Sequence, residues 1–541
     1  MTYAWFSLIP PFITLACTLI TKRVAPSLLL GIFASSLILF NYSILYALRF
    51  TIERIWENSQ LGNLLTWTNN FNTLYTFGFL FVIGIIVSLI SHTGGTQAYS
   101  EKIKSYVSDK RSVETSSILL SLVLFIDDYL NCLTVGCTMR PLADKYGIAR
   151  VKLAYLINSM AVPWVILIPI SSWVAVISNM IEKAGISDTS KTVLISADPF
   201  YAYIRIIPYI FYSFLTITSV LIIVRFRLSF GPMHTHEQIT LERENHDNRN
   251  EQLTIIHPEY IANASSIQEF ILPIASLLIL FVIGLLYSGN YYIFGGKNNL
   301  LQAIQEANFF PVQFFSSLIS LLIGISYSWY QKSINFHSLC KIIKEGITLM
   351  TLANLILLLA WAFSDILQNN LHTGEYIAYL ISGSISLKLL PVIFFLITST
   401  FSIALGSSWA AMMIIIPLAV PLIIVYTGLI PPIDLNNVPI LLPTLGAILS
   451  GAVTGDHLSP LSCPTIMTTT SSGSALMQHI KTQFVYSLPA LTATACAFLV
   501  SGFTINYGIT LNYILSLLTG FIVLGTLITL FSFYQQYKSS L

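Results

Sequence analysis

The stretch "SSILLSLVLFIDDYLNCL", residues 116–133, places two adjacent carboxylates, Asp127 and Asp128, inside an apolar segment. An ionised carboxylate near the bilayer centre costs about 2.5–3.5 kcal/mol, so two of them are seldom kept without a partner or a function. Basic residues lie on both sides of this segment, namely Lys102, Lys104, Lys110 and Arg111 before it and Arg140, Lys145, Arg150 and Lys152 after it. Because basic residues mark the cytoplasmic side, both ends of residues 113–139 are predicted to be cytoplasmic, and the segment to form a re-entrant hairpin.

The rest of the chain has the composition of a membrane protein. Of its 541 residues, 55% are hydrophobic and 9% are charged, whereas about 25% are charged in a typical soluble domain. Apolar segments long enough to span a bilayer recur along the chain. The predicted spans are 4–21, 24–48, 71–91, 153–181, 200–224, 269–288, 308–330, 346–367, 441–472, 484–504 and 510–534. The predicted fold is therefore an all-α polytopic membrane protein with about 11 transmembrane helices, multi-pass in the cytoplasmic membrane.

A second re-entrant hairpin is predicted at residues 389–428. This apolar block is 40 residues long and is interrupted by "GSSW", Gly406 to Trp409, and its length is about twice that of one crossing. With both hairpins in place, the remaining basic clusters fall on one side of the membrane. The second hairpin then opens from the face opposite to the first, with the N-terminus outside and the C-terminus inside.

Several other classes of function are disfavoured. The 26 basic residues lie in short clusters along the chain, and the net charge is only +2. This distribution does not favour nucleic-acid binding. The six cysteines lack a Cys-x-x-Cys pair and are predicted to be free thiols. No Walker loop, dinucleotide fingerprint or nucleophile elbow occurs, so the chain is predicted not to be an enzyme, to hold no cofactor and to use an ion gradient.

Three short motifs recur in the same order in the two halves of the chain. They are "HTG" at 92–94 and 372–374, "PLA" at 141–143 and 417–419, and "SMAVPWVILIPIS" at 159–171 with "SGAVTGDHLSPLS" at 450–462, offset by 280, 276 and 291 residues. The charge pattern places the two copies in opposite membrane orientations, and inverted repeats with broken helices are typical of secondary transporters. We expect residues 1–224 to form a first membrane repeat, 225–268 a polar cytoplasmic linker and 269–541 a second repeat.

The first candidate ion site is the tip of the first hairpin. A carboxylate that binds either a proton or a cation provides the competition that exchange requires, and Asn131 and Thr134 add oxygens of the kind that hard cations bind. The structural alternative is that Asp128 caps a helix beginning at Tyr129 while Asp127 pairs with a basic residue.

The second candidate site is "GDHLSPLSCPTIMTTTSSG", residues 455–473. Its glycine and prolines disfavour a continuous helix, and a broken helix in a membrane must face protein or a water-filled cavity. The polar residues expected around the break are Asp456, His457, Ser459, Ser462 and Thr465. The structural alternatives are a helix cap for Asp456 and bonding of the hydroxyls to helix carbonyls.

Two serine pairs complete the candidate site, and each is followed by a tryptophan. They are Ser171 and Ser172 before Trp173, and Ser407 and Ser408 before Trp409. We expect the first hairpin to place its carboxylates near the membrane midplane opposite the serines of the second hairpin. The tryptophans line the cavity or pack as core residues.

These regions resemble the NhaC family of sodium/proton antiporters, within the wider ion-transporter superfamily. The resemblance lies in "FIDDYLNCLTVGCTMRPLADKYGIARVKLAYLINSMAVPWVILIPISSWVAV" (125–176), "GSSWAAMMIIIPLAVPL" (406–422) and "GDHLSPLSCPTIMTTTSSGSALMQHIKTQFVYSLPAL" (455–491), and it extends roughly over residues 70 to 490. It implies cation/proton exchange by alternating access, with Asp127, Asp128 and Asp456 matching family carboxylates that are candidates for binding Na⁺. Some members are thought to exchange small organic acids.

The chain departs from the family pattern at two positions. Cys463 and Ile177 stand where the resemblance implies acidic residues. With fewer fixed negative charges, a cavity binds cations less tightly and suits a zwitterion or an anion better.

Three hypotheses follow from the sequence. The first is a sodium/proton antiporter with H⁺ and Na⁺ as coupling ions. The second is a proton- or sodium-coupled transporter of an amino acid or small organic acid, and the third, less favoured, is a channel. The expected partners are the small ion or solute and the lipid bilayer, without nucleic acid; a homodimer is compatible with each hypothesis.

Overall fold

The computed structural model describes residues 4–21, 23–62, 71–95, 98, 102, 108–125, 127–169, 171–188, 193–246, 266–305, 307–373, 376, 386–460 and 462–540. Within these ranges the chain is almost entirely helical. The helices of the first half are α1 (Ile9–Thr21), α2 (Val24–Leu39), α3 (Ile44–Ser59), α5 (Asn72–His92), α7 (Lys110–Val123), α8 (Asp128–Lys145), α9 (Arg150–Leu167), α10 (Ser172–Lys183), α11 (Pro199–Ile206), α12 (Phe211–Phe226) and α13 (Gly231–His246).

The second half continues the helical pattern. Its helices are α14 (Gln268–Ser288), α15 (Leu300–Gln305), α16 (Phe309–Tyr330), α17 (Phe336–Asp365), α19 (Leu390–Leu405), α20 (Ser408–Thr427), α21 (Leu441–Leu458), α22 (Cys463–Ser472), α23 (Leu476–Phe503) and α24 (Ile509–Ser540). Two strands of two residues each, β1 (Ile195–Ser196) and β2 (Ile433–Asp434), pair in parallel.

The predicted all-α polytopic membrane fold is confirmed. Eight helices of the described residues are long and apolar enough to span a membrane, or nine if the bent pair α11 and α12 is counted as one span. This number is lower than the predicted 11, partly because several predicted spans are divided or short. The helices α1 and α2, for example, have 13 and 16 residues, and a span needs about 20.

Four predicted spans are divided into separate helices, and one of them, residues 441–472, divides between α21 and α22 at the break that the sequence predicted. Residues 24–48 contain all of α2, a turn and the start of α3, because Asn41 and Tyr42 adopt left-handed conformations with φ of 48° and 66°. Residues 153–181 are divided between α9 and α10. Residues 200–224 bend by 46° between α11 and α12, next to Pro208, whose ring cannot be accommodated inside a straight helix.

Both predicted hairpins are present, and they open toward opposite ends of the molecule. The strands that follow α10 and α20 pair with each other at one end, through Ile195 and Ile433. At the other end, Gly473 at the end of α22 lies against Arg140 of α8. A Cβ atom added to this glycine would be 2.6 Å from Cζ of Arg140. The second arms of the two hairpins, α8 and α20, therefore end at opposite ends of the bundle.

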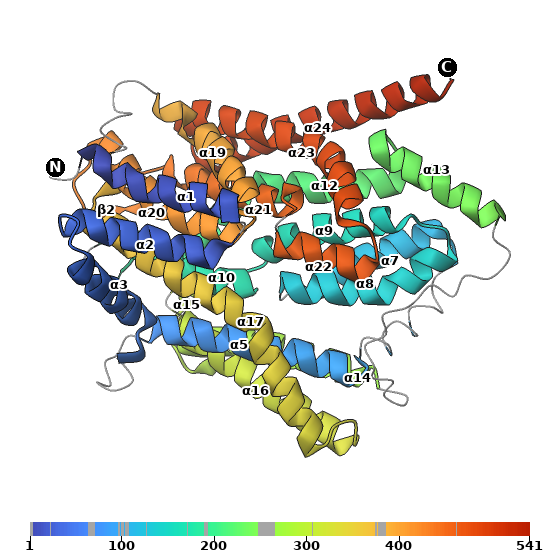
Figure 1. The fold of residues 1–541 in the computed structure, drawn as a ribbon, viewed down its shortest axis with the longest axis horizontal. Coiled ribbons are helices and arrows are strands. Elements are labelled where there is room, and N and C mark those ends of the chain that lie inside the picture. The colour runs from blue at the N-terminus through green and yellow to red at the C-terminus, as the bar shows by residue number, and fades with distance from the viewer. Residues whose placement is uncertain are drawn as a thin grey trace.

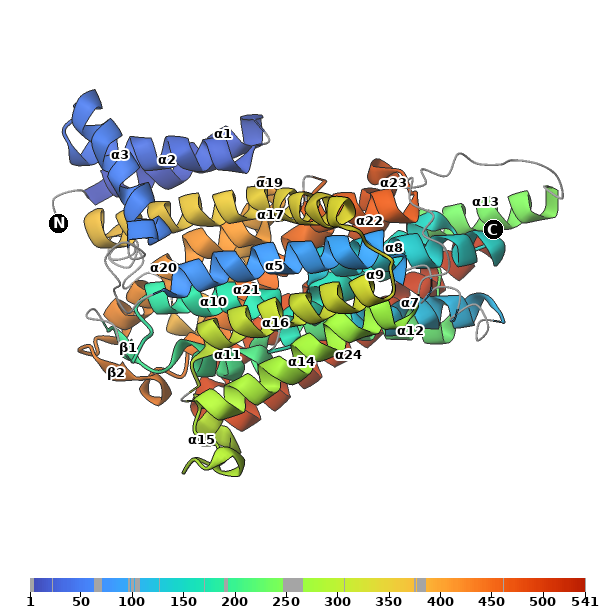
Figure 2. The ribbon, with the colours of Figure 1, turned by 90° about the horizontal axis from the view of Figure 1, so that it is seen from below.

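The helices are arranged in three groups (Figure 1). Helices α5, α16 and α17 lie together along one edge, α23 and α24 lie along the opposite edge, and the hairpins and divided helices lie between them. Figure 2 shows α1, α2 and α3 on the outer side of α17 and α19. Helices from both halves of the sequence pack together: α5 and α17 cross where a Cβ on Gly84 would lie 2.4 Å from the carbonyl oxygen of Gly346.

The polar segment 225–268 contains the helix α13, which is joined to the membrane bundle by ion pairs. Nζ of Lys152 in α9 lies 2.8 Å from a carboxylate oxygen of Glu114 in α7 and 2.5 Å from one of Glu237 in α13. The Lys152 and Glu114 side chains are only 8% and 7% exposed. This ion-paired triad links α13 to α7, the first arm of the first hairpin, and to α9.

Candidate functional site

The candidate site forms where four helices end and four begin. Helices α7, α9, α19 and α21 end, and α8, α10, α20 and α22 begin, at breaks in the chain, and contacts between the breaks bring several of these ends together. A helix start has N–H groups without helical partners and a partial positive charge, and a helix end has unpaired carbonyls and a partial negative charge. The breaks therefore supply both anion- and cation-binding backbone groups to one region.

At the tip of the first hairpin, Asp127 is the helix cap. Its Oδ1 accepts a hydrogen bond of 3.0 Å from the backbone N–H of Tyr129, and α8 begins at Asp128. The expectation that Asp128 caps a helix starting at Tyr129 was wrong by one residue. Because Asp127 provides the cap, the carboxylate of Asp128 is available for other contacts.

Asp128 is almost completely buried and half satisfied. The residue is 2% exposed. Its Oδ1 accepts a hydrogen bond of 3.1 Å from Nε1 of Trp173 in α10. The other oxygen, Oδ2, has no hydrogen-bond partner within the described residues. One oxygen is thus held in place and the other remains able to bind a proton or a cation.

Asn131 and Thr134 lie on α8 after this tip and are buried. Asn131 donates from Nδ2 to the backbone carbonyls of Ser121 at 2.7 Å and Leu124 at 3.3 Å. These carbonyls belong to the end of α7, so the amide closes the hairpin. The Asn131 Oδ1 forms no hydrogen bond among the described residues.

Asp456 provides the second buried carboxylate, at the end of α21. Its Oδ1 accepts a hydrogen bond of 2.9 Å from the hydroxyl of Ser462, and its backbone carbonyl accepts one from Thr465. Its Oδ2 has no hydrogen-bond partner in the described part of the chain. Ser408, at the start of α20, lies beside this carboxyl group.

Cys463 and two tryptophans connect the two carboxylates. The thiol of Cys463 faces the hydroxyl of Tyr129 and lies within electrostatic range of both Asp128 and Asp456. The rings of Trp173 and Trp409 pack at a centroid distance of 4.7 Å, so the starts of α10 and α20 meet. Cys463 itself is an exposed residue.

The predicted serines occupy the breaks in different ways. Ser171 is buried with no partner for its hydroxyl among the described residues, while its carbonyl accepts a hydrogen bond of 3.2 Å from Gln313 in α16. Ser407 caps α20 through a bond of 3.3 Å from the N–H of Ala410. Ser459 is buried at the end of α21, and the Ser172 side chain lies outside the described atoms.

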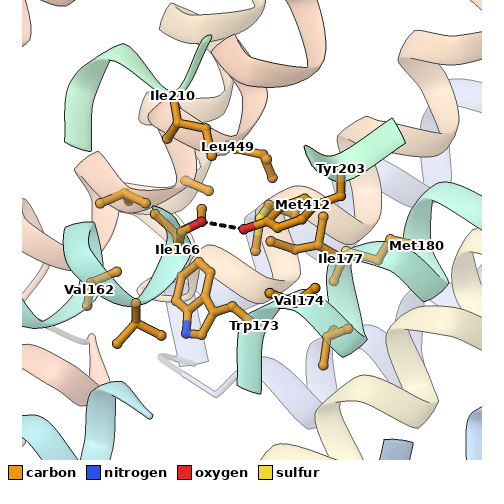
Figure 3. Packing of buried hydrophobic residues seen from close by; sticks show 14 of the residues in the cluster. Val162, Ile166, Trp173, Val174, Ile177, Met180, Tyr203, Ile210, Met412 and Leu449 are labelled. Atoms are coloured by element: carbon orange, nitrogen blue, oxygen red, sulfur yellow. Dashed lines mark hydrogen bonds between the residues drawn. The ribbon is translucent and has the colours of Figure 1, made fainter. Parts of the chain in front are cut away.

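Apolar side chains pack around Trp173 and Ile177 (Figure 3). Ile177 is fully buried among side chains that include Val174, Tyr203 and Met412. The hydroxyl of Tyr203 donates to the carbonyl of Ile166, which the end of α9 leaves without a helical partner. Where the resemblance implies an acid, this chain therefore has a packed isoleucine, and a carboxylate there would be buried among apolar groups.

A group of neutral polar residues lies beyond Asp456, and most of it was missed from the sequence. Asn158 in α9 lies 3.2 Å from the Thr465 hydroxyl and 3.3 Å from Nε2 of His479 in α23. His457, which was predicted, lies 3.0 Å through Nδ1 from the hydroxyl of Tyr212. Polar residues inside apolar spans, and the spacing of His479 and Gln483 by four on one helix face, were signals that could have identified this group.

The described residues contain no group of three or more His, Cys, Asp or Glu side chains that could hold a metal ion. A sodium ion here would be cargo held by carboxylate, hydroxyl and carbonyl oxygens, which are the ligands that hard cations prefer. Two helical hairpins and two divided helices around buried carboxylates define this protein as a membrane-embedded secondary transporter.

The family follows from comparison with known proteins. Residues 164–503 match the Na⁺/H⁺ antiporter family, and the chain belongs to that family. It is 28% identical over 508 residues to an uncharacterised protein of Haemophilus influenzae, covering 92% of this chain and 91% of that one. It is 29% identical over 195 residues to the malate-2H⁺/Na⁺-lactate antiporter of Bacillus subtilis, covering 35% and 36% of the two chains.

A solved structure shares the fold. The YdaH transporter of Alcanivorax borkumensis is similar with a TM-score of 0.52 at 14% identity, over 85% of this chain and 89% of that one. At this identity the likeness concerns the fold alone. The family consists of transporters rather than enzymes, and the first hairpin with Asp127 and Asp128 precedes the matched residues.

Proposed function

We propose that this protein exchanges sodium ions for protons across the cytoplasmic membrane and that Asp128 and Asp456 carry the exchanged ions. The observation that supports this function is the state of the two carboxylates. Each is 2% exposed, has one oxygen held by a hydrogen bond and has a second oxygen without a partner among the described residues. A buried carboxylate in this state favours either a proton or a cation.

The two occupants exclude each other, and this competition couples their transport. When Asp128 and Asp456 are ionised, their free oxygens and the nearby hydroxyls of Ser408 and Ser462 form a negative site for Na⁺. Protonation of the carboxylates removes the charge that holds the cation. Asp127 contributes its negative charge from the cap position, where the start of α8 stabilises the ionised form.

Alternating access fits a chain made of two inverted repeats, with residues 1–224 and 269–541 as the repeats and 225–268 as a linker on the cytoplasmic side. The ends of α9 and α21, Leu167 and Leu458, are 291 residues apart, as are the starts of α10 and α22, Ser172 and Cys463. The third pair of sequence motifs, at 159–171 and 450–462, is offset by the same 291 residues. In this proposal one repeat moves against the other around the fixed carboxylates.

The function can be tested with the purified chain in proteoliposomes that contain a pH-sensitive dye. With an outward proton gradient, external NaCl should cause proton efflux and alkalinise the lumen, and choline chloride should not. If sodium and lithium leave the luminal pH unchanged at every pH between 6 and 9, cation/proton exchange is excluded.

A second candidate function is proton- or sodium-coupled transport of a small organic acid. The starts of α8, α10, α20 and α22 meet at the site, and helix starts bind carboxylates. Cys463 and Ile177 also remove two of the negative charges that the family resemblance implies. A relative is described as exchanging malate and lactate with ions, which makes hydroxy acids a first panel of solutes for uptake by the same proteoliposomes.

A further inference from the structure

Five neutral residues beside Asp456 form a buried polar group, which we name the neutral cluster. They come from four helices and are Asn158 in α9, His457 in α21, Thr465 in α22, and His479 and Gln483 in α23. All five are 0% exposed. Hydrogen bonds of 3.2 Å and 3.3 Å join Asn158 to Thr465 and His479, and one of 2.9 Å joins Gln483 to Ser159, the neighbour of Asn158.

The neutral cluster has more hydrogen-bonding capacity than its own contacts use. Four of its side-chain atoms form no hydrogen bond within the described residues: Oδ1 of Asn158, Nε2 of His457, Nδ1 of His479 and Oε1 of Gln483. The backbone carbonyl of Asn158 lies near the His457 ring, although Nε2 of His457 has no hydrogen-bond partner among the described residues. A buried polar atom without a partner costs about 1–3 kcal/mol, so four together indicate that an additional polar group occupies this place.

The chemistry of the unpaired atoms restricts that group. Nδ2 of Asn158 can only donate, so Nε2 of His479 must accept and the imidazole proton lies on Nδ1, where it is an unpaired donor. The oxygens of Asn158 and Gln483 are unpaired acceptors. A group that both donates and accepts pairs with the His479 donor and with one of these two oxygens; a hydroxyl does this, whereas a carboxylate cannot donate and an ammonium cannot accept.

The neutral cluster lies one side chain away from the ion site. The hydroxyl of Thr465 contacts both the Asp456 carbonyl and the Asn158 amide. Thr465 also belongs to the first turn of α22, whose N–H groups and partial positive charge favour a carboxylate. A small molecule with a carboxylate at the start of α22 therefore has its adjacent carbon substituent close to Asn158 and His479.

We propose that the neutral cluster is a hydroxyl-binding subsite and that the transported solute is a small hydroxycarboxylate. This inference rests on the second candidate function, transport of an organic acid, and specifies its substrate class. The hydroxyl donates to Asn158 or Gln483 and accepts from Nδ1–H of His479, while the carboxylate binds the start of α22. An acid without the hydroxyl leaves the same buried atoms unpaired and binds less tightly.

Calorimetric titration of the full chain in detergent with two matched pairs of acids tests the proposal. The pairs are L-lactate with propionate and L-malate with succinate, which differ only by the hydroxyl. We expect the hydroxy acid of at least one pair to bind about tenfold more tightly, which corresponds to about 1.4 kcal/mol. Equal affinities within both pairs would overturn the proposal without any variant.

Variants place the preference at the neutral cluster. Asn158→Leu and His479→Leu should each reduce the preference for the hydroxy acid to about onefold and leave the affinity for the acid without the hydroxyl within about twofold. Gln478→Leu changes an exposed neighbour of His479 on α23 and should keep the preference. His479→Asn, which keeps a polar side chain, provides a further variant if the leucine variants do not fold.

Two further outcomes separate this proposal from the proposed antiport. If the preference survives in both the Asn158 and His479 variants, the hydroxyl binds elsewhere and the proposal is wrong. If none of the four acids binds while sodium still drives proton efflux, the cluster holds only water, and antiport stands without a hydroxy-acid substrate. If the acids bind with the expected preference while sodium moves no protons, the subsite stands and sodium/proton exchange fails.

Discussion

The indole nitrogen of Trp173 donates a hydrogen bond of 3.1 Å to Oδ1 of Asp128. This bond joins the start of α10 to the tip of the first hairpin and is buried on both sides, since the two residues are 0% and 2% exposed. The Trp173 ring also packs on Trp409 of the second hairpin. One side chain therefore contacts the carboxylate and connects the two hairpin tips.

Replacement of Trp173 by Phe should separate these two roles. Phenylalanine keeps an aromatic ring against Trp409 and lacks the N–H donor, so ionised Asp128 loses a charge-assisted hydrogen bond worth about 1.5–3 kcal/mol. We expect the pH of half-maximal sodium-driven proton efflux to rise by about one unit. An unchanged pH profile in proteoliposomes would show that the indole donor does not stabilise the ionised carboxylate during exchange.

Neutral replacement of either site carboxylate should abolish coupled exchange. Asp128→Asn and Asp456→Asn preserve side-chain size and remove the group that binds proton or cation, so efflux should fall by about 100-fold or more. Asp434→Asn, an exposed position in β2, serves as the control and should keep wild-type rates. Retention of more than half of the activity in Asp128→Asn would assign ion binding to Asp456 and Asp127 instead.

Cys463→Asp should strengthen sodium binding. Residue 463 lies within electrostatic range of Asp128 and Asp456, so an added carboxylate raises the negative charge of the site. We expect the sodium concentration for half-maximal proton efflux to fall about tenfold, which corresponds to about 1.4 kcal/mol. Cys463→Ser adds no charge and should leave this concentration nearly unchanged; a similar decrease in both variants would point to steric relief rather than charge.

Removal of the buried cation at Lys152 should destabilise the protein strongly. Lys152→Met leaves Glu114 and Glu237 without the ammonium that lies 2.8 Å and 2.5 Å from them, and loss of one partner of a buried ion pair costs about 3–5 kcal/mol. Thermal unfolding in detergent measures this effect.

Two comparisons test whether burial of the charges is the reason for the loss of stability in Lys152→Met. Arg150→Met removes a cation from the same helix whose partner, Asp144, is 40% exposed, and it should cost less than about 1 kcal/mol. The triple variant Glu114→Leu, Lys152→Met and Glu237→Leu should recover most of the stability, because no buried charge then remains. Similar losses for Lys152→Met and Arg150→Met would contradict the interpretation.

Asp198 should make stability depend on pH. This residue lies outside the spans and caps α11 through a bond of 2.7 Å from the N–H of Tyr201. Burial, with a smaller contribution from the nearby carboxylates of Asp188 and Glu182, raises the pKa of Asp198 to about 7. Because the folded state binds this proton more tightly than the unfolded state, its stabilising effect is complete below about pH 4 and lost as the pH rises to about 7.

Asp198→Asn should therefore make the unfolding temperature less dependent on pH between pH 4.5 and 7. At pH 8 the variant should unfold at a temperature a few degrees higher than the parent protein. Asparagine keeps the helix cap, so the change reports the charge alone. Asp434→Asn changes another capping aspartate, which is exposed and accepts a hydrogen bond of 2.8 Å from the N–H of Asn436. This control variant should show the same dependence of unfolding temperature on pH as the parent protein. An unchanged pH slope in Asp198→Asn would show that Asp198 does not titrate in this range.

The sequence by itself determined the class of fold and the main breaks. Apolar length predicted the membrane helices, and the polar "DDY", "GSSW" and "GDHLSPLS" interruptions predicted the two hairpins and one divided helix, because carboxylates and prolines are poorly accommodated in a continuous span. The 291-residue offset of the third motif pair coincides with the ends and starts of the divided helices. Local periodicity did not reveal the turn at Asn41 and Tyr42, since left-handed residues other than glycine carry little sequence signal.

Only the tertiary structure decided which groups meet. Asp128 and Asp456 are 328 residues apart in the chain, and their relation depends on Trp173, Ser408 and Cys463, which come from three other helices. The same holds for Asn158 and His479, whose contact joins α9 to α23. A sequence shows that a polar residue lies in an apolar span, but its hydrogen-bond partner is determined by the packing of helices that are distant in the chain.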